Sequence, residues 1–163
     1  MKKIGTLALT LALAGSLTVP ALAAEETAVP ISADTGYGTA LVLNGETLDL
    51  TGIPGVEGGT LLPLRLLAEA DHGSAYWDEE NNESWFYFGD NRITVKFADN
   101  SVWVDDEQVK SQAYVTGGVT FVEAGVLEML EGYTAEQAED GSSITITTPN
   151  NDPMVKAAYQ IME

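Results

Sequence analysis

Cysteine is absent from the 163-residue chain, and histidine occurs once, as His72. The absence of cysteine excludes disulfides, thiolate metal sites and attachment through a lipid-modified cysteine. A single imidazole excludes copper sites and catalytic zinc sites that need two histidines. A serine triad would have only His72 as its base, and no Gly-x-Ser-x-Gly elbow occurs, so the sequence argues against a serine hydrolase.

Basic residues are also scarce: 7 lysines and arginines stand against 25 aspartates and glutamates, for a formal net charge of −18. Such a surface repels nucleic acid and anionic lipid. We therefore expect no nucleic-acid partner, and no membrane association once the N-terminal segment described next has been removed. The charge is compatible with solubility, cation binding or basic partners, and favours none of them.

Long hydrophobic runs are limited to one, residues 4–19, which follows Lys2 and Lys3 and precedes small residues at Ala21 and Ala23. This arrangement is typical of a secretory signal peptide, and the run is shorter than the roughly 20 residues of a membrane span. We expect residues 1–23 to be cleaved and the mature protein to be secreted, in solution or associated with the cell wall. Residues 24–39 show no sustained apolar period and are expected to form a linker.

Turn and breaker residues then mark the first elements. The segments 40–43 and 46–50 flank Asn44-Gly45, the strongest short hairpin signal, so they predict a β-hairpin. A short strand then leads into a helix that Pro63 opens and Gly73 ends.

The β-rich runs 75–77 and 84–88, separated by a polar turn, predict a second hairpin. Residues 92–97 alternate and predict a further strand. Near the end of the chain, Asp152 as a cap and Pro153 in the first turn predict a C-terminal helix within residues 150–163.

The chain repeats this order of elements. Residues 117–132 align with residues 58–73 without a gap, so that Glu69 falls on Glu128 and Gly73 on Gly132. An internal duplication within residues 40–149, with copies at about 40–98 and 99–149, accounts for this spacing. The predicted fold class is α+β: two hairpin, strand-helix, hairpin units whose antiparallel sheet packs on short helices.

The turn Asn44-Gly45, the segment Pro63-Leu64-Arg65 and the pair Trp77-Asp78 resemble the copper amine oxidase N-terminal-like domain, also called the stalk domain, over residues 40–149. The resemblance implies an accessory β-sheet wrapped against a helix, common in exported proteins of Gram-positive bacteria. Copper and quinone chemistry resides in a separate catalytic domain of the true amine oxidases, so the resemblance implies no copper and no cofactor here. In the second copy, Val122-Glu123-Ala124 replaces the usual proline, aliphatic residue and arginine. The structural motif residues are Pro63, Arg65, Glu69, Gly73 and Trp77.

Aromatic residues are the first candidates for a binding site, although packing in a small core is the expected role of most of them. In a strand of period two, Trp85 and Tyr87 share one face, with Phe86 and Phe88 on the other. We therefore expect any exposed ligand platform at Trp85 and Tyr87. Its partner would be a cell-wall polysaccharide or another exported protein.

The acidic residues cluster in turns, at 78–83, 105–107 and 136–140. Solvated turns are the default interpretation. A carbohydrate-active hydrolase remains an alternative and predicts two carboxylates about 5 to 10 Å apart in a cleft. A calcium-responsive secreted structural protein, with weak calcium binding, is another alternative; it predicts at least three carboxylates within reach of one ion.

We expect Arg65 and His72 to have structural roles. Arg65 lies in an apolar helical segment, so we expect a carboxylate or carbonyl groups to hold its guanidinium as an anchor of the fold. His72 lies near the end of the same helix, where a cation is favoured. With no candidate catalytic residue, the sequence predicts a protein that is not an enzyme but an accessory or interaction module, extracellular or cell-wall associated.

Overall fold

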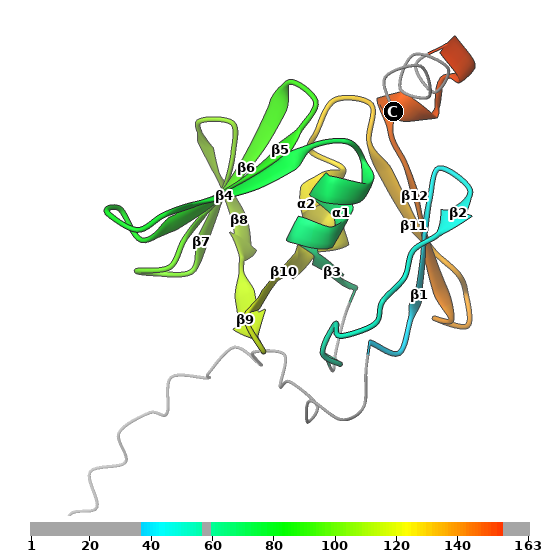
Figure 1. The fold of residues 1–163 in the computed structure, drawn as a ribbon, viewed down its shortest axis with the longest axis horizontal. Coiled ribbons are helices and arrows are strands. Elements are labelled where there is room, and N and C mark those ends of the chain that lie inside the picture. The colour runs from blue at the N-terminus through cyan, green and yellow to red at the C-terminus, as the bar shows by residue number, and fades with distance from the viewer. Residues whose placement is uncertain (1–36, 57–59, 155–163) are drawn as a thin grey trace, which may run out of the picture.

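The computed structural model describes residues 37–56 and 60–154 (Figure 1). The predicted signal peptide, most of the predicted linker and most of the predicted C-terminal helix lie outside the described residues. The strands are β1 (Ala40–Leu43), β2 (Glu46–Thr47), β3 (Leu61–Pro63), β4 (Ser74–Asp78), β5 (Glu83–Phe88), β6 (Asn91–Lys96), β7 (Ser101–Val104), β8 (Glu107–Gln112), β9 (Tyr114–Thr116), β10 (Val119–Glu123), β11 (Thr134–Gln137) and β12 (Ser143–Thr147). The helices are α1 (Leu64–Ala70), α2 (Ala124–Leu127) and the 3-10 helix η1 (Pro149–Asn151).

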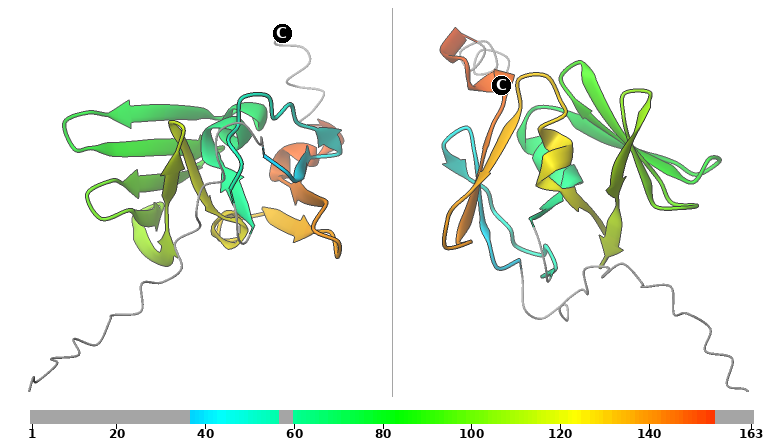
Figure 2. Two further views of the ribbon diagram at one scale, coloured as in Figure 1. Left: turned by 90° about the horizontal axis from the view of Figure 1, so that it is seen from below. Right: turned by 180° about the vertical axis from the view of Figure 1, so that it is seen from behind.

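Three sheets and two short α-helices make up the described fold, which is α+β as predicted. The strand orders are β4-β5-β6-β7-β8, β3-β10-β9 and β11-β12-β1-β2. The helices lie between the five-stranded and four-stranded sheets, and the three-stranded sheet lies beside them (Figures 1 and 2). Of the described elements, no helix is long and apolar enough to cross a membrane.

The hairpins form where the turn residues predicted them. Asn44 and Gly45 take positive φ angles of 51° and 89°, which a tight hairpin turn requires, and Leu43 pairs with Glu46 across the turn. Strands β4 and β5 pair from Ser74 with Tyr87 to Asp78 with Glu83, as the second predicted hairpin. Local turn chemistry therefore specifies both connections.

Helix α1 packs through the residues that the apolar period selected: Leu64, Leu67 and Ala68 are buried. The residue with positive φ at its end is His72 (φ 61°), not Gly73. Gly73 is required for a different reason, because a Cβ there would lie 1.9 Å from the Tyr87 carbonyl oxygen. The helix end and β5 thus approach each other closely only because residue 73 has no side chain.

One pairing links the two ends of the described chain. Strand β1 runs parallel to β12, with Leu41 opposite Ile144 and Leu43 opposite Ile146. All four of these side chains are buried. The N-terminal hairpin is therefore joined to the C-terminal hairpin rather than to the strands that follow it in sequence.

The fold also begins earlier than the sequence indicated. Tyr37, which falls in the predicted linker, stacks on Phe121 with ring centroids 6.3 Å apart, and its hydroxyl donates to the Leu61 carbonyl oxygen. Burial raises the pKa of Tyr37 to about 12. At the other end, the Met154 amide donates to Asp152 Oδ1 at 2.7 Å, consistent with the predicted cap.

Candidate functional site

A row of side chains crosses the five-stranded sheet on its outer face. Tyr76 pairs with Trp85, Trp85 with Thr94 and Thr94 with Trp103, so the four residues stand side by side on β4 to β7. Direct cross-strand partners share a face of the sheet. On β5 to β7, alternate residues such as Phe86, Ile93 and Val102 are buried on the inner face. We call Tyr76, Trp85, Thr94 and Trp103 the aromatic row.

The aromatic row is partly open to solvent. Tyr76 is 57% exposed, and Trp85 and Trp103 are half-buried. The rings of Tyr76 and Trp85 lie 5.4 Å apart with their planes tilted by 33°. No described helix covers this side of the sheet (Figures 1 and 2).

Basic side chains from β6 lie against the two indole rings. The Arg92 guanidinium carbon is 5.7 Å from the centre of the Trp85 ring, and Lys96 Nζ is 4.2 Å from the centre of the Trp103 ring. These distances are typical of cation–π contacts. The long side chains of Arg92 and Lys96 therefore account for part of the burial of the two tryptophans.

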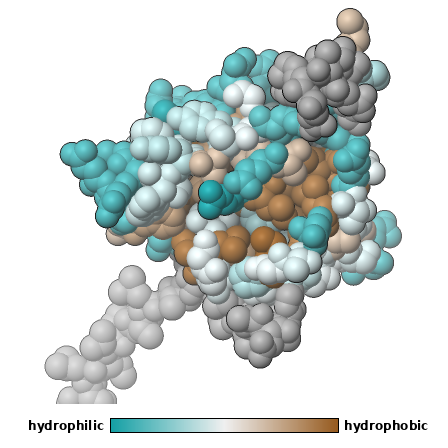
Figure 3. Space-filling view, viewed as in Figure 1, coloured by the Kyte–Doolittle hydropathy of each residue, from teal (hydrophilic) through white to brown (hydrophobic). Residues whose placement is uncertain are grey.

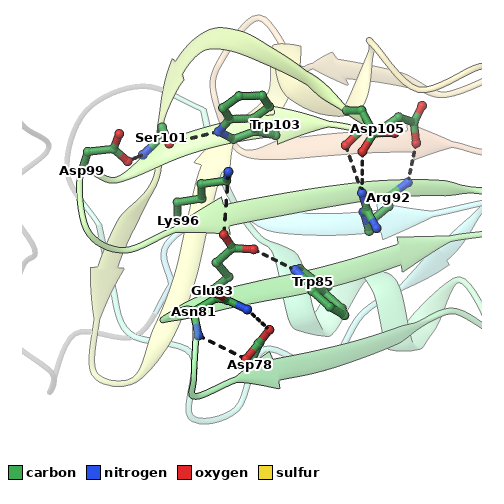
Figure 4. Close-up of polar contacts among 11 residues, drawn as sticks. Asp78, Asn81, Glu83, Trp85, Arg92, Lys96, Asp99, Ser101, Trp103 and Asp105 are labelled. Atoms are coloured by element: carbon green, nitrogen blue, oxygen red, sulfur yellow. Dashed lines mark hydrogen bonds and ion pairs between the residues drawn. The ribbon is translucent and has the colours of Figure 1, made fainter.

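Carboxylates and a hydroxyl hold these groups in place (Figure 4). Glu83 accepts a hydrogen bond from Trp85 Nε1 at 3.2 Å and lies 3.7 Å from Lys96 Nζ. Arg92 Nη2 donates to Asp106 at 2.9 Å. Trp103 Nε1 donates to Ser101 Oγ at 3.1 Å. The rings are thus oriented by polar neighbours on the same face.

Two polar atoms of this region have no partner within the described structure. Thr94 is 4% exposed and its Oγ1 makes no hydrogen bond; the buried Arg92 Nε is also unpartnered. Thr94 stands in the aromatic row between Trp85 and Trp103. A buried hydroxyl without a partner costs stability, and at 4% exposure Thr94 is covered by its neighbours in the row rather than open to a ligand.

The predicted platform residues occupy the same face. Trp85 and Tyr87 are both half-buried, whereas Phe86 and Phe88 are buried in the core. Tyr76 and Trp103 complete the row with Trp85, whereas the strand period alone singled out Trp85 and Tyr87. The position of Tyr76 could have been predicted from the register of the β4–β5 hairpin. Counting residue pairs away from the polar turn places Tyr76 opposite Trp85.

The structural motif residues are spread over several places. Pro63 ends β3 opposite Phe121 of β10. Trp77 lies on the inner side of the β4 edge, 48% exposed, with its ring 5.4 Å from that of Phe97. Arg65 does pair with a carboxylate, Glu69 Oε1, at 2.9 Å.

The exposure of this pair argues against the expected anchoring role of Arg65. Its side chain is 69% exposed and that of Glu69 is 55% exposed. The contact is a surface i,i+4 pair, which contributes only a few tenths of a kcal/mol. The helical period places residue 65 on the face of α1 that points away from the core.

The acidic turns are held by their own backbone. The Asp78 carboxylate accepts bonds from the Glu80 amide at 3.0 Å and from the Asn81 amide at 3.2 Å and side chain at 2.8 Å. The Asn81 side chain is the main cause that lowers the pKa of Asp78. Asp49, Asp99 and Asp140 accept from the amide two residues on, and their pKa values are lowered by Thr51, Ser101 and Ser142. These aspartates shape turns.

In the part of the chain that the structure describes, neither a metal-binding group nor the groove beside α1 supports the alternative functions. Within residues 37–56 and 60–154, no group of three or more histidine, cysteine or acidic side chains is placed to hold a metal ion. A groove of about 270 Å³ beside α1 has one carboxylate, Glu69, among its lining residues. That carboxylate already binds Arg65, so the groove lacks the carboxylate pair of a glycosidase.

One polar cluster was missed by the sequence analysis. Asp71 is 2% exposed, and its carboxylate accepts from the Tyr133 hydroxyl and from Thr148 Oγ1, both at 2.7 Å. Asn44 Nδ2 donates to Thr148 Oγ1 at 2.9 Å, and Asn150 Nδ2 donates to the Asp71 carbonyl at 2.9 Å. Because both carboxylate oxygens are bonded and buried, this cluster joins parts of the fold and offers nothing to a ligand.

Comparison with known proteins gives one match. The sequence profile of the copper amine oxidase N-terminal domain matches residues 42–147, which is more than half of the chain. Searches among curated proteins and among solved structures return no match. The matched domain is non-catalytic and is distinct from the catalytic domain of those enzymes. The chain therefore belongs to the copper amine oxidase N-terminal domain family.

Proposed function

We propose that this protein is an exported, non-catalytic accessory module that binds glycan chains of the cell envelope on the outer face of the five-stranded sheet. The observation that carries the proposal is the aromatic row, partly exposed on a face that no described helix covers. Membership in a non-catalytic family supports an accessory role.

The chemistry of the row suits a sugar ring. A pyranose ring has an apolar face that packs on an aromatic ring, while its hydroxyl groups need hydrogen-bonding partners at the edge. Here the rings of Tyr76, Trp85 and Trp103 provide the apolar surface. Glu83 and Arg92 provide acceptors and donors beside them. A flat, partly polar face of this kind suits a polymer chain better than a small enclosed molecule.

Export is proposed from the N-terminal sequence. The basic start, the single apolar run and the small residues before Ala24 are typical of a cleaved signal peptide. The lack of cysteine excludes retention through a lipid-modified cysteine, and we propose that the aromatic row holds the protein at the cell wall by noncovalent contacts.

An internal duplication is part of the same proposal. The element order supports it: a hairpin, a strand-helix and a hairpin occur from β1 to β5 and again from β7 to β12, where β9 is inserted before β10. The equivalent segments 61–63 and 120–122 meet in the antiparallel pair of β3 with β10. Strand β6 has no counterpart in the second set, which is why one outer sheet has five strands and the other four.

Co-sedimentation of the purified protein with isolated cell-wall sacculi, across a salt series and with or without calcium, tests the function. We expect saturable binding that persists at high salt, because stacking on aromatic rings is not screened by ions. Trp85→Ala and Trp103→Ala should each weaken binding about tenfold or more, since a few aromatic anchors dominate such surfaces.

Trp77→Ala is the matched control, because the same change is made on the opposite face of the sheet. It should leave sedimentation unchanged. Binding that is abolished by moderate salt, or lost equally in Trp77→Ala and Trp85→Ala, would contradict a glycan site on the outer face.

A further inference from the structure

Strand β4 is an edge strand that the fold leaves unprotected. It ends the five-stranded sheet, and none of the backbone hydrogen bonds outside the sheet ladders joins residues 74–78 to another described segment. The strand is five residues long, contains neither lysine nor proline, and has its one charged residue, Asp78, at its last position. Natural sheets usually blunt such an edge with charge, proline, a bulge or a covering element.

The other sheet edges show those protections. Strand β8, at the opposite end of the same sheet, has Lys110 and an irregular register between Ser101 and Trp103. Strand β2 has two residues, and β3 and β9 have three each. Strand β11 has Glu136 at its centre. Among the described edges, β4 alone is long, regular and rich in aromatic residues.

An apolar groove of about 270 Å³ runs beside this edge. Ala75, Tyr76 and Trp77 of β4 form one side of the groove. Leu66 of α1 and Val119 of β10 contribute apolar side chains on the other side. Hydrophobic side chains gather around α1 on the face of the molecule shown in Figure 3. The volume suits one or two side chains of a bound chain rather than a whole cofactor.

Charge at the groove and along the strand favours a basic occupant. In the groove itself Glu69 pairs with Arg65, so the excess negative charge comes from Asp78, the last residue of β4, and from Glu79 and Glu80 after it. The whole chain has a formal net charge of −18, so a second copy of it would be repelled. An extended partner segment with alternating apolar and basic residues would satisfy both the groove and the charge.

We propose that the edge of β4 and the groove beside it bind an extended, basic segment of another exported protein, which adds as a strand to the five-stranded sheet. The backbone of the segment bonds to the free edge of β4. Every second side chain enters the groove between Trp77, Leu66 and Val119, and the intervening basic side chains face the acidic residues. This site shares Tyr76 with the glycan face but does not depend on glycan binding there.

The test uses a six-residue peptide in which lysine and valine alternate, with both ends blocked. Two controls accompany it: a peptide with glutamate in place of lysine, and the lysine peptide with alternate backbone amides methylated. Nuclear magnetic resonance of the isotope-labelled full protein follows the amides of residues 74–78 and 118–120 during titration. We expect saturable shifts there for the lysine peptide only, weakening as salt is added.

Val119→Glu and Leu66→Glu each place a charge in the groove and should weaken binding about tenfold or more. Val115→Glu is the matched control, since Val115 is 51% exposed on β9 outside the groove, and it should bind like the unaltered protein. Native-like amide spectra show that each variant is folded. Equal binding by the methylated peptide, or unchanged binding by both groove variants, would overturn the proposal. A dimer of the protein that Val119→Glu dissociates would also overturn it, because a second copy of the chain would then occupy the groove. Failure of the protein to bind cell-wall sacculi would contradict only the glycan site on the outer face, not peptide binding at β4.

Discussion

At the scale of single residues, the hydroxyl of Thr148 connects three parts of the fold. It donates to the buried Asp71 carboxylate and accepts from Asn44 Nδ2 and from the Asn150 amide. Thr148→Val keeps the shape but leaves these groups without a partner. We expect the free energy of unfolding to fall by about 1 to 3 kcal/mol, measured by urea denaturation.

Tyr133→Phe should have an effect of similar size, because it removes the other hydroxyl that donates to the Asp71 carboxylate. Thr51→Val is the control: its hydroxyl bonds to Asp49 at an exposed turn, where water replaces the lost bond. Equal destabilisation by Thr51→Val and Thr148→Val would show that burial of the cluster is not the cause.

Tyr37 predicts a dependence on alkaline pH. Burial raises its pKa from 10.0 to about 12 in the folded protein, while the unfolded chain ionises near the ordinary value. A raised folded-state pKa gives stability that is complete below the unfolded pKa and is lost as pH rises through the folded pKa. Between pH about 10 and about 12, the free energy of unfolding should therefore fall by about 2 kcal/mol more in the unaltered protein than in Tyr37→Phe.

Urea denaturation across this pH range measures the difference. The two proteins are compared by the slope of their free energy of unfolding against pH. Absolute values do not serve, because Tyr37→Phe also lowers stability at every pH by removing the hydrogen bond to the Leu61 carbonyl. Parallel pH profiles for the two proteins would show that Tyr37 is not the titrating group.

At the scale of secondary structure elements, helix α1 is stabilised by its buried face and not by its charged pair. Leu64, Leu67 and Ala68 are buried, whereas Arg65 and Glu69 are exposed. Arg65→Met should therefore change the free energy of unfolding by less than about 0.5 kcal/mol, as measured by thermal or urea unfolding. Leu67→Ala, on the same helix, should cost about 2 to 5 kcal/mol by comparison. A large loss in Arg65→Met would restore the anchoring role that the sequence suggested.

At the scale of the whole molecule, the proposed export predicts a defined mature chain. Expressed in a Gram-positive host, the protein should be recovered from the medium or the wall with Ala24 as its first residue, as intact mass spectrometry would detect. Replacing Ala21 and Ala23 together with leucine should block cleavage and leave the precursor in the membrane fraction. An uncleaved protein in the cytoplasm would contradict both export and a role at the envelope.

The features of the fold that the sequence predicted correctly are those that depend on neighbouring residues in the chain. Asn44 and Gly45 specify a hairpin because few other residues adopt positive φ at low cost, and the period of Leu64, Leu67 and Ala68 selects the buried face of α1. Alternation along β5 likewise placed Trp85 and Tyr87 on the face opposite Phe86 and Phe88. Family membership followed from the same short motifs.

The rest depended on residues that are distant in the chain. The partners Asn44 and Thr148 are 104 positions apart, and Asp71 and Tyr133 are 62 apart. Nothing local distinguishes the buried Asp71 from the exposed acidic residues of the turns, because its environment is made by other elements. Trp103 could be placed in the same row as Trp85 only from the register of three strands, β5, β6 and β7.

By itself, the sequence determined the fold class, the two hairpins, the buried face of α1 and the absence of cysteine or multi-histidine chemistry, since each depends on residue type and short-range spacing. Only the tertiary structure decided that β1 joins β12, that Arg65 is exposed, that Asp71 is buried and that β4 is a free edge beside a groove. Those outcomes depend on which surfaces meet when the sheets close over the helices, and burial and strand pairing are properties of the assembled chain.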